Sequence, residues 1–327
     1  MIEKRPVTLF FYPTYSCNDN CSFCFFAQKA AADKIHLPFL RVKKAISHLI
    51  NKFSAESVVL AGGEPTIYKN FPLLMDYLGR QYIFSKRIKE FYLATNAIKC
   101  ADDKFAAYLS NFFTPHSGVF SQLNIAASGF EDGNAISRLK KKGAINLSKR
   151  IPNANYILVL TEKNLVASPK IFNFIRNLFR SYYRNSTSFF GMELRIPFLV
   201  EGVSGTFSSI PSPRRIKKYA TNLFSLATKD GIPLKLRNMP LCYIENFMEQ
   251  GGDYFVRSSK PAELRVVEFG PDSIGEIAKI KPKPFLPEVI KTKKCRGCRQ
   301  FLKCSGIDSD YLKKFDYPPP NPFISGS

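Results

Sequence analysis

Residues 14–26, with the sequence TYSCNDNCSFCFF, place three cysteines directly after an apolar run at residues 7–12. Cys17, Cys21 and Cys24 have the spacing C-x3-C-x2-C. Three thiolates on one short loop can bind three irons of a [4Fe-4S] cluster, whereas ferredoxin-type clusters have four cysteine ligands. The loop therefore predicts a cluster with one iron open to a ligand that the protein does not supply.

Two other interpretations of these thiols are a zinc site and a set of unrelated buried cysteines. Structural zinc normally has four protein ligands, and catalytic zinc normally has histidine or carboxylate partners. The loop has neither a fourth cysteine nor a histidine. These residues therefore favour an iron-sulfur cluster over a zinc site.

Around this loop, apolar strand-like segments alternate with amphipathic helix-like segments up to about residue 230, which is typical of βα units in a parallel sheet. The predicted strands are residues 7–12, 57–61, 90–95, 120–127, 155–161 and 192–198. The predicted helices are residues 40–53, 71–86, 102–113, 134–150, 169–183 and 213–229. Most strands run into polar residues, glycine or proline, as expected where the loops after the strands carry the chemistry.

The second predicted strand runs into Gly62-Gly63-Glu64-Pro65. Two glycines allow the backbone to approach a ligand closely, and a carboxylate can pair with an ammonium group. Alone, these four residues indicate only a turn between a strand and a helix. Their position about 40 residues after a C-x3-C-x2-C loop makes the combination informative.

That combination, with aromatic Phe23 just before the last cysteine, resembles the signature of the radical S-adenosylmethionine (SAM) superfamily. The resemblance implies an α/β fold, a partial (βα)6 TIM-like barrel, with a SAM-binding [4Fe-4S] cluster. It further implies an enzyme in which the cluster cleaves SAM reductively to a 5′-deoxyadenosyl radical that abstracts a substrate hydrogen.

The resemblance also assigns cofactor contacts. Gly62, Gly63, Glu64 and Pro65 would bind the SAM amino group, with Phe23 beside the cluster. The turn at Asn96 is similar to the family's Thr-Asn-Gly turn, with Ala97 in place of glycine, and Ser128 would meet the ribose. Arg195 would pair with the SAM carboxylate or, alternatively, form a salt bridge within the barrel.

After Gly231, proline and glycine interrupt short segments, so we predict a barrel at residues 1–231 and a separate extension at residues 232–327. The extension contains Cys242, Cys295, Cys298 and Cys304, and its C-x2-C-x5-C segment resembles the SPASM and twitch extensions of radical SAM enzymes. Four thiolates would bind one fully ligated auxiliary [4Fe-4S] cluster. A four-cysteine zinc knuckle is the alternative. We expect Cys100 to be an ordinary buried thiol, and a hydrogen-atom donor near the active site is the alternative.

The formal net charge of +22 fits a nucleic acid, an acidic substrate or leader peptide, or a solvated basic surface. The sequence has no apolar stretch of 18 residues and no signal-peptide pattern, so we expect a cytoplasmic protein. By analogy, the first substrate expectation is a ribosomally made peptide or protein. The alternatives are a small molecule or cofactor precursor, and tRNA. A flavodoxin or ferredoxin would act as reductase, and a non-enzymatic iron-sulfur carrier is disfavoured because it would give the Gly-Gly-Glu-Pro motif no purpose.

Overall fold

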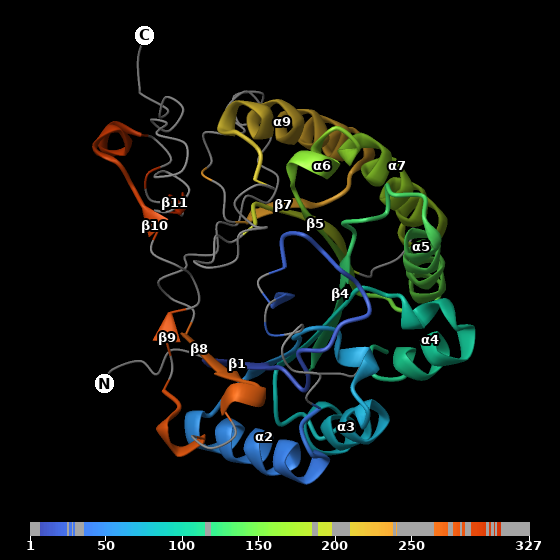
Figure 1. Ribbon diagram of the computed structural model, residues 1–327, viewed down its shortest axis with the longest axis vertical. Coiled ribbons are helices and arrows are strands. Elements are labelled where there is room, and N and C mark those ends of the chain that lie inside the picture. Colours follow the sequence, from blue (N-terminus) through green and yellow to red (C-terminus); the bar gives the residue numbers. More distant parts are fainter. Residues whose placement is uncertain are drawn as a thin grey trace.

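The computed structural model describes residues 7–24, 26–27, 29, 36–114, 119–184, 189–197, 210–237, 240, 265–273, 277–281, 283–284, 289–298, 301, 304 and 306–308. Most of these residues form a curved sheet with helices packed against its outer face (Figure 1). The main hydrophobic core fills the space between the sheet and these helices.

The sheet has nine strands among the described residues, in the order β7-β6-β5-β4-β3-β2-β1-β8-β9. Every neighbouring pair is parallel except β8 and β9, which are antiparallel. The two outer strands of this order do not pair with each other in the described part of the chain, so the sheet is an open barrel. The strands are β1 Val7–Phe11, β2 Ser57–Leu60, β3 Glu90–Thr95, β4 Phe120–Ala126, β5 Ala154–Val159, β6 Phe190–Arg195, β7 Leu234–Arg237, β8 Arg265–Phe269 and β9 Lys283–Pro284.

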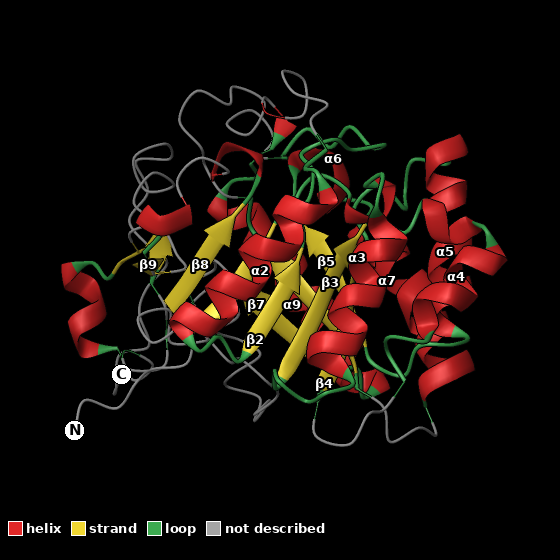
Figure 2. Cartoon of the chain, turned by 90° about the horizontal axis from the view of Figure 1, so that it is seen from below, coloured by secondary structure: helices red, strands yellow, loops and turns green. Residues whose placement is uncertain are grey.

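Helices lie over the sheet (Figure 2), and the longer ones bury apolar residues at helical spacing. In α2, for example, Val42, Ala45, Ile46 and Leu49 are buried at helical spacing, and the helix ends at Ser54 in the left-handed conformation. The α-helices among the described residues are α2 Phe39–Phe53, α3 Phe71–Leu78, α4 Asp103–Ser110, α5 Ala135–Ser148, α6 Glu162–Leu165, α7 Ser168–Leu178 and α9 Pro213–Asp230.

The predicted α/β barrel is confirmed, and each of the six predicted strands corresponds to one of β1 to β6. Two predicted helices were wrong at their C-terminal ends. After α3 and α7 the backbone continues as π-helical turns at Gly79–Ile83 and Phe179–Tyr183. Hydrophobic periodicity did not distinguish these turns from α-helix, because both bury one side.

The sheet also contains strands beyond the six predicted ones. Strands β7 and β8 lie after residue 231, in the predicted extension, yet β7 pairs with β6 and β8 pairs with β1. These two short strands, with the sequences LKLR and RVVEF, extend the parallel part of the sheet on both sides. The domain boundary at residue 231 stays a prediction, and the antiparallel pair β10 Val289–Ile290 and β11 Ile307–Asp308 lies outside this sheet. Among the described helices, none combines the length and apolar character needed to cross a membrane.

Candidate functional site

The three-cysteine loop leaves the carboxyl end of β1 and lies inside the ring of helices (Figure 1). Cys17 is exposed, whereas Cys21 and Cys24 are partly buried, and none of the three is in a disulfide. The backbone turns tightly here, because Cys24 N donates to the Cys21 carbonyl at 3.1 Å and Asp19 N donates to Cys17 Sγ at 3.4 Å. The predicted cluster ligands therefore share one compact loop at the strand ends.

Burial raises the pKa of all three thiols, to about 11 for Cys17. Without a metal the thiols are protonated at neutral pH. Binding iron as thiolates would therefore release protons, as thiolate sites in general do. In the part of the chain that the structure describes, no three His, Cys, Asp or Glu side chains are grouped closely enough to bind a single metal ion.

The two glycines after β2 pack against the backbone of this cysteine loop. Gly63 N donates to the Thr14 carbonyl at 3.1 Å, and Glu64 N donates to the Ser16 carbonyl at 2.8 Å. A Cβ atom on Gly63 would lie 2.2 Å from the Ser16 carbonyl oxygen, and one on Gly62 would lie 2.6 Å from that of Thr14. Gly62 also has a φ of 125°, which favours glycine. The glycines thus allow the cysteine loop to pack on the end of β2, a role that sequence analysis missed.

The Glu64 carboxylate is buried, with an exposed fraction of 1%. Its Oε1 accepts hydrogen bonds from Thr66 N at 3.1 Å, Thr66 Oγ1 at 2.7 Å and Thr95 Oγ1 at 2.8 Å. Its Oε2 accepts from Asn96 N at 2.6 Å. Burial raises the pKa of Glu64, while these four donors oppose the rise. A carboxylate has about four acceptor positions, so Glu64 is fully engaged with the ends of β2 and β3. Its predicted contact with the SAM ammonium stays a prediction.

This arrangement predicts that Glu64→Gln lowers the stability of the cluster-free protein. In either orientation of the glutamine amide, its NH2 group would face an N–H or O–H group that now donates to the carboxylate. A buried donor without an acceptor costs about 1–3 kcal/mol. We expect the free energy of unfolding in urea to fall by about that amount. Thr95→Val, which removes one of the four donors, is the milder control. Weaker SAM binding with unchanged stability would instead identify Glu64 as a direct ligand of the ammonium.

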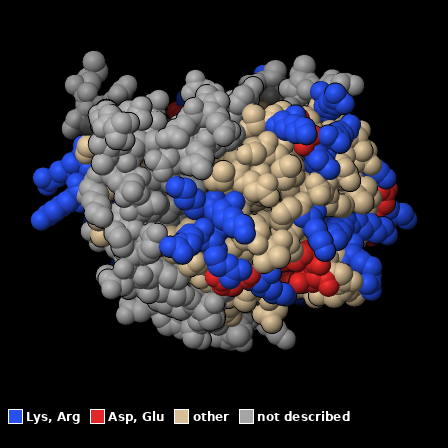
Figure 3. Space-filling model, turned by 90° about the horizontal axis from the view of Figure 1, so that it is seen from above, with Lys and Arg blue, Asp and Glu red and all other residues tan. Residues whose placement is uncertain are grey.

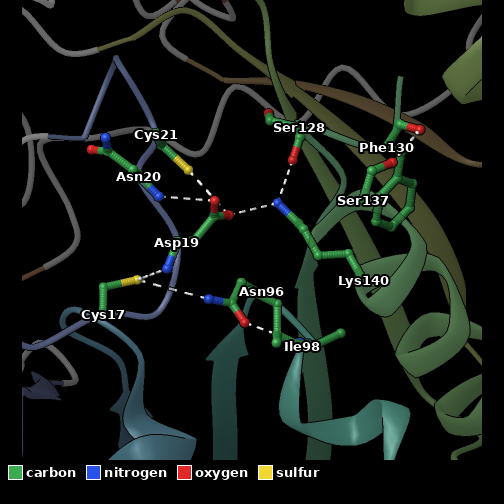
Figure 4. A network of polar contacts seen from close by, with 12 residues as sticks. Cys17, Asp19, Asn20, Cys21, Asn96, Ile98, Ser128, Phe130, Ser137 and Lys140 are labelled. Atoms are coloured by element: carbon green, nitrogen blue, oxygen red, sulfur yellow. Dashed lines mark hydrogen bonds and ion pairs between the residues drawn. The ribbon is translucent and has the colours of Figure 1, made fainter. Parts of the chain in front are cut away.

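Asn96 links β3 to the cysteine loop. Its Nδ2 donates to Asn18 Oδ1 at 2.8 Å and lies 3.7 Å from Cys17 Sγ, while its Oδ1 accepts from Ile98 N at 3.0 Å (Figure 4). The next residue, Ala97, has a φ of 63°, so the backbone keeps the left-handed turn although the glycine typical of the family is absent. Asn96 contacts the loop that holds the cysteines, and its predicted contact with the cofactor stays a prediction.

Ser128 lies just beyond β4, beside the other side of the cysteine loop. Its Oγ accepts a hydrogen bond from Val159 N at 3.1 Å, and its carbonyl oxygen accepts from Lys140 Nζ (Figure 4). Ser128, Cys21, Phe23 and Lys140 help to line a cavity of about 300 Å³. Three predicted site residues, Cys21, Phe23 and Ser128, therefore meet at one hollow between the cysteine loop and the start of α5.

Lys140 on α5 was missed by sequence analysis, because its position within the run Lys140-Lys141-Lys142 indicated a solvated helix face. Its side chain is only 2% exposed, and Nζ lies 2.8 Å from Asp19 Oδ2 within the cysteine loop. Burial alone would raise the pKa of Asp19, but the Lys140 ammonium reverses the effect and the pKa lies below its usual value. In the sequence, the signal for a nearby buried cation was Asp19, the acidic residue between Cys17 and Cys21.

Residues 11–131 match the family model of the Radical SAM superfamily. The matched segment contains the cysteine loop, Gly62 to Pro65, Asn96 and Ser128. This segment of the chain is therefore similar to the radical SAM superfamily. No curated protein matches the sequence.

Several solved structures have a similar fold over most of the chain. Streptococcus suis SuiB bound to the precursor peptide SuiA has a TM-score of 0.58 at 13% identity, covering 99% of this chain and 76% of that one. anSMEcpe with bound AdoMet and Cp18Cys peptide has a TM-score of 0.60 at 17% identity, covering 97% of this chain and 93% of that one. The likeness therefore continues beyond the matched segment into the C-terminal extension.

The structure also places two further predicted site residues, Arg195 and Pro65. Arg195 pairs through Nε with the Glu193 carboxylate, two residues earlier on β6, which corresponds to the alternative salt bridge within the barrel. Pro65 is buried as the first residue of a short 3₁₀ turn, Pro65–Ile67, that follows Glu64. Their predicted contacts with SAM stay predictions.

The C-terminal cysteines are described in part, and Cys242 lies outside the described residues. Cys298 N donates to the Cys295 carbonyl at 3.0 Å, which makes a tight turn. Gly306 N donates to Cys304 Sγ at 3.4 Å, the same i+2 contact that Asp19 N makes to Cys17. Cys100 is fully buried against the core, as expected.

Proposed function

We propose that Cys17, Cys21 and Cys24 hold a [4Fe-4S] cluster whose fourth iron binds SAM, and that the enzyme uses it to modify a ribosomally made peptide or protein. The observation that carries the cluster assignment is the anchoring of the cysteine loop on two sides. Gly63, Glu64 and Asn96 hold it from β2 and β3, while Lys140 holds it from α5. A loop fixed in this way can present three thiolates in one geometry.

The residues present fit the cluster and SAM. The donor set is three thiols from one loop, which suits a cluster that keeps one iron for another ligand. Ser16, directly before Cys17, has a buried hydroxyl oxygen with no hydrogen-bond partner among the described residues. Such a group is normally satisfied in the working state, and a polar ligand beside the loop would satisfy it.

When bound, the cluster supplies the electron that cleaves SAM to methionine and the 5′-deoxyadenosyl radical, which abstracts a substrate hydrogen. The chain's own residues would bind SAM and hold the cysteine loop in position. Phe23 and Ser128 line the cavity beside Cys21, where they would contact SAM, and Gly62 and Gly63 keep the cysteine loop seated on β2. Glu64 fixes the ends of β2 and β3 relative to each other.

A peptide substrate is favoured because two of the similar structures, SuiB with SuiA and anSMEcpe with Cp18Cys, contain bound peptides. Fold likeness alone is a weak guide to substrate, so small molecules and tRNA are the alternatives.

On the face shown in Figure 3, Lys and Arg side chains form several separate groups with acidic side chains among some of them. We propose a flavodoxin or ferredoxin as the electron donor.

The test is anaerobic reconstitution with iron and sulfide, followed by reduction with dithionite in the presence of SAM. We expect 5′-deoxyadenosine, with its formation accelerated by the natural substrate. A short peptide encoded beside the gene should gain or lose mass in the same reaction, whereas total tRNA should leave the rate unchanged. A reduced, iron-loaded protein that makes no 5′-deoxyadenosine would be an electron carrier, and the proposal would fail.

For the extension, we propose that Cys242, Cys295, Cys298 and Cys304 bind one fully ligated [4Fe-4S] cluster. The turn at Cys295 and the backbone donor to Cys304 support thiolates at these positions. Iron and sulfide analysis should therefore give about eight irons per chain, from two four-iron clusters. About four irons with one zinc would identify the quartet as a zinc knuckle.

A further inference from the structure

A buried ion pair joins α5 to the cysteine loop, and none of the proposed SAM contacts accounts for it. Lysine side chains are almost never fully buried unless they are paired. The Lys140 ammonium lies 2.8 Å from Asp19 Oδ2 and 2.5 Å from the Ser128 carbonyl oxygen. The ammonium therefore connects the cysteine loop to the end of β4 (Figure 4).

Asp19 lies between two of the proposed cluster ligands and contacts both. Its backbone N donates to Cys17 Sγ at 3.4 Å, and its Oδ2 accepts from the Cys21 thiol at 3.5 Å. Its Oδ1 accepts from Asn20 N at 2.9 Å, which closes the turn. Asp19 therefore links the two cysteines, contacting Cys17 through its backbone N–H and Cys21 through its carboxylate.

Once iron is bound, the Lys140 ammonium is needed to offset repulsion between the Asp19 carboxylate and the Cys21 thiolate. Cys21 as a thiolate has no proton to donate to Asp19, so a carboxylate and a negatively charged ligand would stand side by side. Like charges at such a distance repel strongly in a partly buried site. The Lys140 ammonium lies in direct contact with the carboxylate and offsets this repulsion.

The geometry points to Lys140 as a positioning residue, which sets the cysteine loop through Asp19 and raises the reduction potential of the bound cluster. This inference rests on the proposed function, because it requires the cluster on Cys17, Cys21 and Cys24. Net charge and hydrogen bonds around the sulfurs are known determinants of cluster potential. Lys140 and Asp19 act in opposite directions, because the ammonium favours the added electron and the carboxylate disfavours it.

The test compares Lys140→Met, Asp19→Asn and the double variant with the exposed control Lys142→Met on the same helix. The midpoint potential is measured by redox titration of the electron paramagnetic resonance (EPR) signal that changes when SAM is added. We expect Lys140→Met to lower the potential, Asp19→Asn to raise it, and the double variant to return it toward the wild-type value. Lys142→Met should change nothing.

Loss of iron to a chelator gives a second measurement. Residues that support metal ligands typically contribute ten- to a hundred-fold to metal affinity, so Lys140→Met should lose iron about ten-fold faster. The double variant should lose it more slowly than Lys140→Met, because no carboxylate is left unpaired. If Lys140→Met fails to fold, two comparisons remain. Asp19→Asn should raise the midpoint potential relative to the wild type, and the double variant should have a lower midpoint potential than Asp19→Asn.

A wild-type protein with no SAM-responsive cluster signal would overturn the proposed function and this inference with it. A normal wild-type signal whose potential moves in neither variant, or in the same direction in both, would overturn this inference alone. Weaker SAM binding by Lys140→Met, with potential and iron content unchanged, would also overturn it, because Lys140 would then be a ligand of SAM.

Discussion

Replacing Cys17, Cys21 and Cys24 together with alanine is expected to abolish 5′-deoxyadenosine formation while the barrel stays folded. A cluster with three protein ligands has no spare thiolate, so each single Cys→Ala variant should also lose activity. The loop lies outside the main core, which α2 to α9 and the sheet form, and Cys17 is exposed. We therefore expect the free energy of unfolding of the cluster-free protein to change by less than about 1 kcal/mol.

Cys100→Ala is the matched control for this variant. Cys100 is fully buried in the core, so the same change should lower stability by about 1 kcal/mol and leave SAM cleavage intact. Iron content, the visible absorbance of the cluster and 5′-deoxyadenosine are measured side by side. A triple variant that still makes 5′-deoxyadenosine would refute the assignment of the three ligands.

Gly63→Ala should be nearly as damaging, although it adds a single methyl group. The new Cβ atom would lie 2.2 Å from the Ser16 carbonyl oxygen and 2.3 Å from that of Tyr15. Backbone atoms cannot move aside as a flexible side chain can, so the cysteine loop must shift away from β2. Misplacing catalytic groups by about 1 Å can cost a hundred-fold in rate. We expect at least that loss in 5′-deoxyadenosine formation, with reduced iron retention.

Gly133→Ala separates this clash from the general effect of replacing glycine. Gly133 has a φ of 68°, but a Cβ atom there would meet no other atom within 4 Å. It should cost about 1 kcal/mol of stability through backbone strain and keep the cluster. If Gly63→Ala behaves like Gly133→Ala, the close packing of the cysteine loop on β2 has no functional importance.

The sequence was sufficient for features that depend on local pattern. The spacing of Cys17, Cys21 and Cys24, and the apolar segments that became β1 to β6, follow from neighbouring residues alone. It was insufficient where distant segments meet. Strands β7 and β8 are short segments with two charged residues each, and only their pairing with β6 and β1 identifies them as strands.

The same limit applies to the site. Glu64 has donors from Thr95 and Asn96, some thirty residues away, and nothing in the motif itself shows that these would occupy its carboxylate. Lys140 is 121 residues from Asp19, in a run of lysines that indicated exposure. Buried charge pairs of this kind depend on the packing of α5 against the cysteine loop, which periodicity does not reveal.

The central claim is that the cysteine loop holds a cluster with an iron available to SAM. It is tested most directly by EPR spectroscopy of the reduced protein carrying Cys295→Ala, Cys298→Ala and Cys304→Ala, before and after SAM is added. We expect one four-iron cluster, with an EPR spectrum that changes when SAM is added. A cluster signal that SAM leaves unchanged, or no cluster at all in this variant, would contradict it.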